Sequence, residues 1–258
     1  MVNDLQIQLL GQSGCRLVIG NTVIYFDPYL SNSAYDSVDK SLVRMFPVSL
    51  MPIDICDADY VFISHDHIDH CDKISLMGIF SGSKKSIFIG PINVIKKLKL
   101  WGVPDDRIIL ASDTENIMVK NIYVKVMPSA HPEVLRDSED NIMCVGYVFI
   151  YENIKIYLSG DTSLNAYVVD MLKKQAPFDC VLIPVNEDSY YKRIKNIIGN
   201  MSIREAMWLA NELNAEYFIP VHWDMFLDNS VYIDEIFATY LSIGYSFKLR
   251  IYSSFGKK

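Results

Sequence analysis

The chain lacks the features that mark secreted and membrane-spanning proteins. Its five cysteines form no C-x-x-C pair and are odd in number, which argues for reduced thiols and against a disulfide framework. Apolar runs such as Val145–Tyr151 have the length of a strand and fall well short of the ~20 residues that a membrane span requires. The first residues contain neither the basic region nor the long apolar stretch of a secretory signal. We therefore expect a cytoplasmic protein that does not associate with membranes.

Positive charge is also scarce, with 24 Lys and Arg residues against 31 Asp and Glu residues and a formal net charge of -7. No basic stripe with interleaved aromatic residues is present, so we expect no nucleic acid partner. No Gly/Ser-rich or Pro-rich linker, low-complexity tract or internal repeat interrupts the chain. Because half of the residues are hydrophobic, the composition predicts one compact domain over residues 1–258.

The most informative feature that is present is the histidine distribution. Three of the five histidines fall within six residues. Imidazole together with carboxylate oxygen is a ligand mixture that suits Zn²⁺, Mn²⁺ or Fe²⁺. Incidental histidines in a solvated turn are the alternative for an isolated H-x-H, and the further carboxylate and imidazole at these offsets favour a metal site. The run reads His65-Asp66-His67-Ile68-Asp69-His70.

Four β-prone stretches each lead to a nitrogen or oxygen ligand. Residues 58–64 precede the histidine run, and the three others lie far along the chain. Taken singly, a histidine at a strand end is more often structural than a ligand. Taken together, they leave no histidine outside the set, which favours ligands at one edge of the sheets. The three later stretches are residues 124–130, which lead to His131, residues 154–160, which lead to Asp161, and residues 216–221, which lead to His222.

These motifs resemble those of the metallo-β-lactamase fold superfamily, whose signature is H-x-H-x-D-H followed by a His, an Asp and a last His. The opening residues 9–14 and the stretch Phe26-Asp27-Pro28 resemble that superfamily as well. The resemblance implies an α/β fold, the four-layer αβ/βα sandwich, and two divalent metal ions. It also implies a division of the ligands: His65, His67 and His131 for one metal, Asp69, His70 and His222 for the second, and Asp161 bridging both.

The C-terminal third resembles the L-ascorbate-6-phosphate lactonase group, whose members are cytoplasmic, oligomeric and usually manganese-dependent. The residues that carry this resemblance are Pro184-Val185-Asn186, Gly199-Asn200-Met201-Ser202 and the stretch from Ile219 to Phe226. The chain is shorter than those lactonases, and its residues 187–193 are more polar and charged. The resemblance implies a homo-oligomer with Mn or Zn, or alternatively Fe, that opens a phosphorylated sugar-acid lactone.

As a mechanism we expect hydrolysis by a hydroxide that bridges the two metals. Asp69 would orient this nucleophile and shuttle a proton to the leaving alkoxide. A phosphodiesterase that uses the same metals is an alternative, and a non-catalytic scaffold of the same fold is a second one. A small anionic substrate would require polar contacts, although any single basic residue is more often an exposed surface charge. The candidate contacts are Asn186, Asn200, Arg44, Lys192 and Arg193.

Periodicity and turn residues also predict the elements. Ser202 followed by Glu205 predicts a capping box, and Asp234 with Glu235 suits the first turn of a helix. Helices are predicted over 91–100, 163–174, 202–213 and 230–242. Strands are predicted over 5–10, 15–19, 23–26, 60–64, 86–90, 122–127, 144–151, 154–159, 180–185, 216–221 and 246–252.

Overall fold

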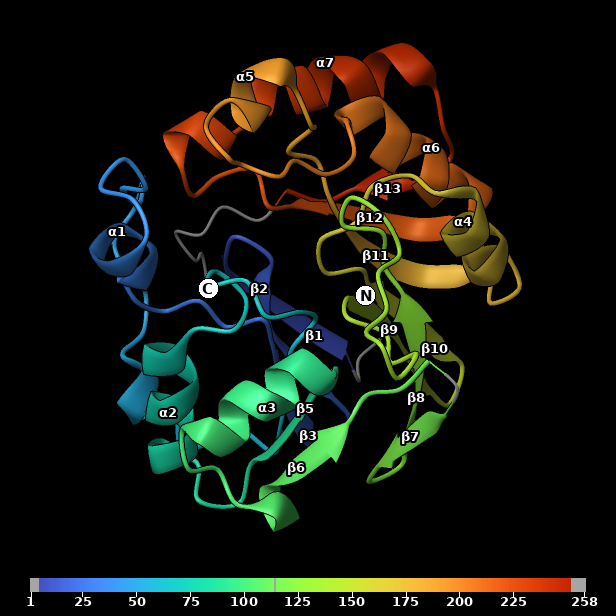
Figure 1. Cartoon of the computed structure of the whole chain (residues 1–258). Helices are drawn as coiled ribbons and strands as arrows, with labels where there is room; N and C mark the ends of the chain where they lie inside the picture. The colour runs from blue at the N-terminus through green and yellow to red at the C-terminus, as the bar shows by residue number, and fades with distance from the viewer. Residues whose placement is uncertain (1–4, 114, 252–258) are drawn as a thin grey trace.

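The computed structural model describes residues 5–113 and 115–251 and contains two β-sheets that face one another (Figure 1). The first sheet has its strands in chain order. Its first three strands pair antiparallel as a meander, and the remaining pairs are parallel. The strands are β1 (Leu5–Gly11), β2 (Gly14–Ile19), β3 (Thr22–Phe26), β4 (Tyr60–Phe62), β5 (Ile87–Gly90) and β6 (Ile108–Leu110).

The second sheet has the order β13-β12-β11-β10-β9-β8-β7. Strands β7 to β10 pair antiparallel, and β10 to β13 pair parallel. The two sheets therefore repeat one plan, an antiparallel meander continued by parallel strands. The strands are β7 (Asn116–Val119), β8 (Ile122–Pro128), β9 (Val145–Tyr151), β10 (Ile154–Leu158), β11 (Phe178–Pro184), β12 (Ala215–Val221) and β13 (Lys248–Leu249).

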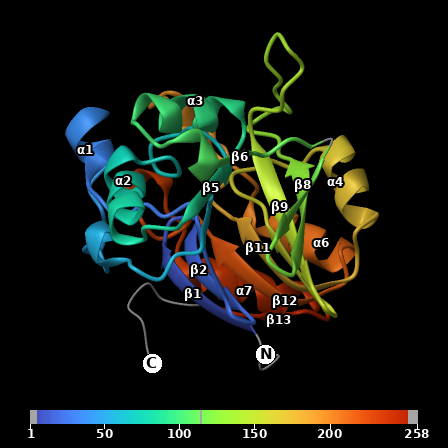
Figure 2. The same ribbon diagram turned by 90° about the horizontal axis from the view of Figure 1, so that it is seen from below.

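Helices cover the outer face of each sheet (Figures 1 and 2). One buried cluster packs α2 and α3 on the first sheet, and another packs α4, α6 and α7 on the second. Within the described ranges no helix is long and apolar enough to cross a membrane. The helices are α1 (Ser33–Ser37), α2 (Lys73–Gly82), α3 (Ile92–Leu100), α4 (Ala166–Lys173), α5 (Tyr190–Arg193), α6 (Ile203–Glu212) and α7 (Ile233–Ile243), with 3-10 turns at Pro52–Asp54, Asp105–Arg107 and Leu227–Asn229.

The main hydrophobic core lies between the two sheets and contains residues of both, which completes the four-layer αβ/βα arrangement. Phe62 of β4 packs edge-on against Phe149 of β9, with ring centroids 4.9 Å apart. The hydroxyl of Tyr147 on β9 donates a hydrogen bond of 2.8 Å to the carbonyl of Ile63, just beyond β4. These contacts tie the sheets together two or three residues before the histidine run, so the core itself fixes where that run begins.

Most predicted elements are present, and the predicted α/β sandwich is confirmed. The capping box is also present, since the Ser202 side chain accepts from the Glu205 amide and Glu205 accepts from the Ser202 amide. The predicted helix over 163–174 begins later, because Asn165 caps it at Ala166. Residue 252 of the predicted last strand lies outside the described residues.

The sequence did not predict the helix α2 or the strands β6 and β7, nor the short helices α1 and α5. Helix α2 contains two glycines and few charged residues, a composition that gives no clear helical signal. Its glycines serve tertiary packing, because a Cβ at Gly78 would lie 2.4 Å from Pro52 Cβ and one at Gly82 would lie 2.4 Å from the carbonyl oxygen of Ile55. The helix begins where the Asp72 carboxylate accepts from the amides of Ile74 and Ser75.

Candidate metal centre

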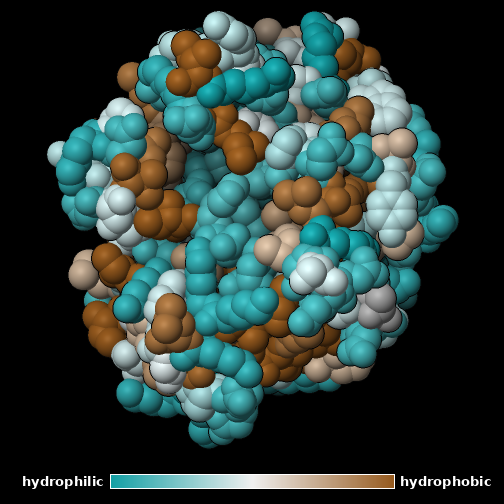
Figure 3. All heavy atoms as spheres, in the orientation of Figure 1, coloured by the Kyte–Doolittle hydropathy of each residue, from teal (hydrophilic) through white to brown (hydrophobic). Residues whose placement is uncertain are grey.

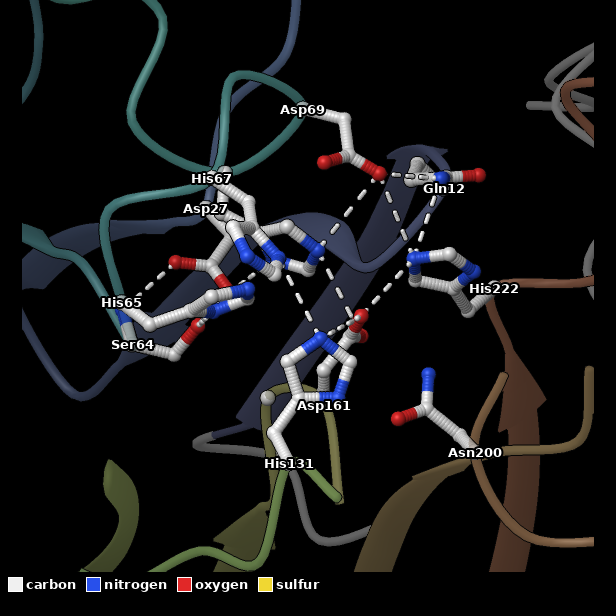
Figure 4. Close-up of polar contacts among 12 residues, drawn as sticks. Gln12, Asp27, Ser64, His65, His67, Asp69, His131, Asp161, Asn200 and His222 are labelled. Atoms are coloured by element: carbon white, nitrogen blue, oxygen red, sulfur yellow. Dashed lines mark hydrogen bonds and ion pairs between the residues drawn. The ribbon is translucent and has the colours of Figure 1, made fainter. Parts of the chain in front are cut away.

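All seven candidate ligands lie at one edge of the two sheets, each in a segment that follows a strand (Figure 4). The histidine run follows β4, His131 follows β8, Asp161 follows β10 and His222 follows β12 directly. Gly160 permits a close approach between two of these segments, because a Cβ at this residue would lie 2.4 Å from Ser64 Cβ. Its φ of +59° also falls in the left-handed region that favours glycine. The Asp161 segment can therefore reach the start of the histidine run.

The ligand atoms form groups in which all atoms lie within 4.8 Å of one another. The groups are His65, His67 and His131, then His65, His70 and Asp161, and then Asp69, His70 and His222. The first and the last have the membership that the family resemblance implied, and the division of the ligands between two metals stays a prediction. Asp161 lies between these two groups, because its oxygens are 3.6 Å from His131 Nε2, 3.4 Å from His70 Nε2 and 3.2 Å from His222 Nε2.

The chemistry of this cluster fits divalent metal ions. His65 is 1% exposed, and its Nε2 is buried without a hydrogen-bond partner. Leaving such a polar atom unpaired costs about 1–3 kcal/mol, so a buried cluster of this kind requires a further electron-pair acceptor. Five imidazoles and two carboxylates are a donor set that Zn²⁺, Mn²⁺ and Fe²⁺ accept.

The histidines of the cluster differ in the direction in which their pKa values are shifted. Burial, followed by the neighbouring imidazoles, lowers the pKa of His65, and burial lowers that of His131 to about 4. These rings are therefore neutral and offer lone pairs. Burial also disfavours charge on His70 and His222, but the nearby carboxylates, Asp161 first, outweigh it and raise both pKa values, to about 9 for His222. The same negative potential attracts a metal cation in competition with protons.

A second layer of side chains holds the ligands, and the sequence did not single these residues out. Asp27 accepts hydrogen bonds from His70 Nδ1 at 2.8 Å and from the hydroxyl of Ser64 at 2.6 Å. The side-chain amide of Gln12 donates to Asp69 Oδ2 at 2.6 Å and lies 3.0 Å from His222 Nε2. Asp27 and Gln12 lie in the stretches that resemble the superfamily, but only the fold shows which ligand each one contacts.

Three non-glycine residues of the centre adopt a left-handed backbone, with φ of 55° at Gln12, 40° at Asp27 and 61° at His222. Such residues are uncommon, and they concentrate at functional sites where the surrounding structure holds them in place. Here the amide of His222 donates to the carbonyl of Gln12 at 2.9 Å, which joins two of them. The strain therefore lies at the second ligand set.

The three basic residues predicted to contact a substrate bond to groups of the chain itself. Arg44 donates to the backbone carbonyls of Tyr29, Ser31 and Phe46. Lys192 is buried and donates to the carbonyl of Glu187, whereas Arg193 is exposed and pairs with Asp188. Contact of these residues with a substrate stays a prediction.

The two predicted amide contacts, Asn186 and Asn200, are both buried. Figure 4 shows Asn200 beside the centre, on the side of Asp161 and His222. Figure 3 shows a hollow lined by hydrophilic residues between α1 and α5, with hydrophobic residues around it.

Comparison with known proteins identifies the family. A family model described as the Beta-lactamase superfamily domain matches residues 22–223. An uncharacterized protein of Mycobacterium tuberculosis is 28% identical over 227 residues, which cover 86% of this chain and 59% of that protein. A probable L-ascorbate-6-phosphate lactonase, UlaG, of Salmonella heidelberg is 26% identical over 197 residues, 71% of this chain and 54% of the lactonase. The chain thus spans little more than half the length of these relatives.

Solved structures share the fold over nearly the whole chain. The isothiocyanate hydrolase from Delia radicum gut bacteria has a TM-score of 0.74 at 17% identity, covering 96% of both chains. Igni18, described as a metallo hydrolase of the archaeon Ignicoccus hospitalis, has a TM-score of 0.70 at 17% identity and covers 97% of this chain and 95% of that one. At these identities the likeness concerns the fold alone.

Proposed function

This chain belongs to the β-lactamase superfamily, and from that premise we propose that it is a dinuclear metal-dependent hydrolase that opens a lactone ring. The observation that carries the proposal is the pair of ligand groups with Asp161 between them. The lactonase named among the relatives supports a phosphorylated sugar-acid lactone as the substrate class. We extend the proposal to Mn²⁺ or Zn²⁺ as the metal and to a small anionic substrate.

The residues of the centre have two roles: some would bind the metal ions, and others fix the orientation of those ligands. His65, His67 and His131 would hold one ion and Asp69, His70 and His222 the other, with Asp161 shared. When bound, two such ions lower the pKa of a water molecule and polarise the oxygen of a carbonyl group.

Two orienting contacts keep these ligands in place. Asp27 keeps the ring of His70 in one orientation, because its carboxylate accepts from Nδ1 and leaves Nε2 facing Asp161. Gln12 does the same for Asp69 through Oδ2.

Asp69 is the carboxylate of this centre best placed to move a proton. Its side chain is 18% exposed, against 4% for Asp161, so it is the more accessible of the two carboxylates. Burial disfavours its charged form, but His70 and His222 outweigh this effect and hold its pKa below the usual range. A carboxylate of this kind rests ionised and is a weak base, so it would accept a proton from a water molecule that the bound ions make more acidic, and pass it to the leaving alkoxide as the ring opens.

Metal analysis of the purified protein, followed by a substrate screen, tests the proposal. We expect two divalent ions per chain and hydrolysis of phosphorylated or free sugar-acid lactones, with little activity on bis(p-nitrophenyl) phosphate. A reversed preference would establish the phosphodiesterase instead. Protein that binds no metal after reconstitution with Mn²⁺ and Zn²⁺ would establish a non-catalytic scaffold.

His67→Ala is the matching variant, because His67 contributes to one metal group only. We expect it to lose both metal and activity. Lys84→Ala, which replaces an exposed side chain, is the control and should behave as the wild-type protein. A variant at His67 with full metal content and an unchanged rate would contradict the assignment.

A further inference from the structure

Three asparagines form a chain of side-chain amides that runs toward the metal centre. Asn186 Nδ2 donates to Asn229 Oδ1 at 3.0 Å, and Asn200 Nδ2 donates to Asn186 Oδ1 at 3.0 Å. The backbone pairs as well, since the amide of Asn200 donates to the carbonyl of Asn186 and the amide of Asp188 donates to the carbonyl of Asn200. These bonds fix both the place and the orientation of the Asn200 amide at the base of the loop over residues 187–199.

One acceptor oxygen of this amide chain has no hydrogen-bond partner. Asn200 is 4% exposed, and its Oδ1 is buried without a hydrogen-bond partner. Burying an unpaired carbonyl oxygen costs about 1–3 kcal/mol, so such an atom at a site calls for an explanation. Figure 4 shows the Asn200 amide beside the ligand cluster with its oxygen turned toward the ring of His131.

One ring nitrogen of His131 also lacks a hydrogen-bond partner. Its Nε2 faces the centre, 3.2 Å from His67 Nδ1 and 3.6 Å from Asp161 Oδ2. Its Nδ1 points away from these groups and is buried without a partner. Pro132 and Asp188 line one cavity of about 370 Å³, which places the His131 segment next to the base of the 187–199 loop.

The two unpaired atoms match in chemistry. An imidazole that binds a metal through Nε2 carries its proton on Nδ1, and metal-bound histidines almost always donate this proton to a nearby oxygen. The two atoms are not bonded to each other in the structure, but Figure 4 shows the Asn200 oxygen turned toward this ring. We propose that Asn200 is a positioning residue whose Oδ1 accepts the Nδ1 proton of His131 when the ring binds a metal through Nε2, and that Asn186 and Asn229 hold the amide in that orientation. A reversed amide would place its NH₂ group against the N–H of His131, donor against donor.

This inference rests on the proposed metal site and adds to it a role for an amide that the sequence had assigned to the substrate. Asn200 then sets the tautomer and the ring angle of one ligand, so it acts on metal affinity before any substrate binds. Asn186, which is fully buried and uses both ends of its amide inside the chain, acts only through Asn200.

The first test measures metal affinity of the full chain by competition with a chelator, using Zn²⁺ and Mn²⁺ as probes. We expect Asn200→Ala to weaken binding roughly 10–100-fold, as removal of such outer partners typically does. Asn200→Asp keeps an acceptor for His131 but loses the amide group that donates to Asn186 Oδ1, so binding should fall less than in Asn200→Ala. An Asn200→Ala protein that binds metal as tightly as the wild type overturns the proposal.

Asn165→Ala is the matched control for a general loss of stability. Asn165 caps α4 through the amides of Tyr167 and Val168, and its side chain makes none of the contacts of the centre. It should lower the thermal midpoint of the metal-free protein without moving the metal affinity. If Asn165→Ala weakens metal binding as much as Asn200→Ala, the effect is one of stability and the proposal is wrong.

A double-mutant cycle identifies the partner. Asn200→Ala should cause no further loss of affinity in a His131→Ala background and should still cause its full loss in a His222→Ala background. The opposite pattern would assign the Asn200 oxygen to His222, whose Nδ1 is also buried and unpaired, and would overturn the inference. Failure of the proposed function looks different, because wild-type protein would then bind metal without opening any lactone.

Discussion

At the scale of single residues, the centre is organised by charge. Asp161 is 4% exposed and lies within 3.6 Å of nitrogens from both ligand groups, so its negative charge is shared by the two halves of the cluster. An isolated buried carboxylate would be unfavourable, and here the surrounding imidazoles hold its pKa well below the usual range despite burial. The Asp161 charge is thus common to both ligand groups.

Asp161→Asn tests this shared role, because it removes the charge and keeps the shape. We expect at least one metal ion per chain to be lost, together with a fall in hydrolysis beyond the roughly 10–100-fold that outer partners produce. Metal stoichiometry by elemental analysis and initial rates are the measurements. Asp170→Asn, an exposed carboxylate on α4, should change neither, and an Asp161→Asn protein with two metals would contradict the shared role.

Asp27→Ala tests the support of His70. The change leaves the Nδ1–H of a fully buried ring without its acceptor, and it places alanine at a φ of 40°. We expect a loss of about 1–3 kcal/mol in the free energy of unfolding and weaker metal binding. Urea unfolding of metal-free protein and chelator competition measure the two effects.

The matched control for that change is Asp27→Asn. Asparagine tolerates the left-handed backbone and keeps an acceptor oxygen, so it should recover most of both losses. Equal behaviour of the two variants would show that His70 does not need this hydrogen bond.

At the scale of elements, local rules and tertiary packing contribute differently in different helices. In α6 the Ser202–Glu205 box satisfies amides at the first turn by purely local bonds. In α2 the two glycines disfavour a helix, and the helix exists because they allow close contact with Pro52 and Ile55. One helix could therefore be predicted and the other could not.

Ser202→Ala removes the side chain that caps the first turn of α6. We expect it to lower the free energy of unfolding by about 0.5–2 kcal/mol, the usual cost of losing a cap. Ser242→Ala, which changes an exposed serine near the end of α7, serves as the control and should stay within about 0.5 kcal/mol of the wild type. Equal unfolding midpoints for the two variants would argue against a stabilising box.

Gly78→Ala tests the packing signal in α2. Helix propensity alone predicts a gain of about 1 kcal/mol from this change. The new Cβ would lie 2.4 Å from Pro52 Cβ, so we expect overpacking to reverse the sign and to cost about 1–3 kcal/mol. Chemical denaturation measures the difference, with Ser81→Ala on the same helix as the control. A stabilised Gly78→Ala protein would show that the segment around Pro52 moves readily to make room for the added methyl group.

At the scale of the whole molecule, the centre lies where both sheets end, so metal binding and folding are coupled. The ligands come from segments after β4, β8, β10 and β12, two sheets that one shared core holds together. An ion that binds only when these ends converge stabilises the folded chain by mass action. Removing the metal ion should therefore make the packing of the two sheets against each other less stable.

Metal removal is the corresponding experiment. With free metal at about 100 times its dissociation constant, binding adds about 2.7 kcal/mol, and for a chain of this size about 1 kcal/mol shifts the thermal midpoint by roughly 2–4 °C. We therefore expect EDTA to lower the midpoint by about 5–10 °C and metal addition to restore it. Asp161→Asn should show a smaller shift, and identical midpoints with and without EDTA would exclude the coupling.

The sequence by itself determined the ligand types and most of the elements. Ligands that follow strands are local signals, because the strand pattern and the histidines lie side by side in the chain. The same holds for the capping box, and it explains why His65, His131 and His222 could be recognised without coordinates. The grouping of ligands came from the family resemblance, and the structure brings all seven side chains into overlapping groups.

Only the tertiary structure decided which side chains support the ligands. The contacts of Asp27 with His70, of Gln12 with Asp69 and of Asn186 with Asn200 join residues 14–57 positions apart, and no local pattern encodes such pairs. The α2 glycines belong to the same class, since their partners lie on another segment. The reason is physical. A side chain can serve as a metal ligand because of its own chemistry, whereas the residue that supports it depends on which groups the folded core brings within hydrogen-bonding distance.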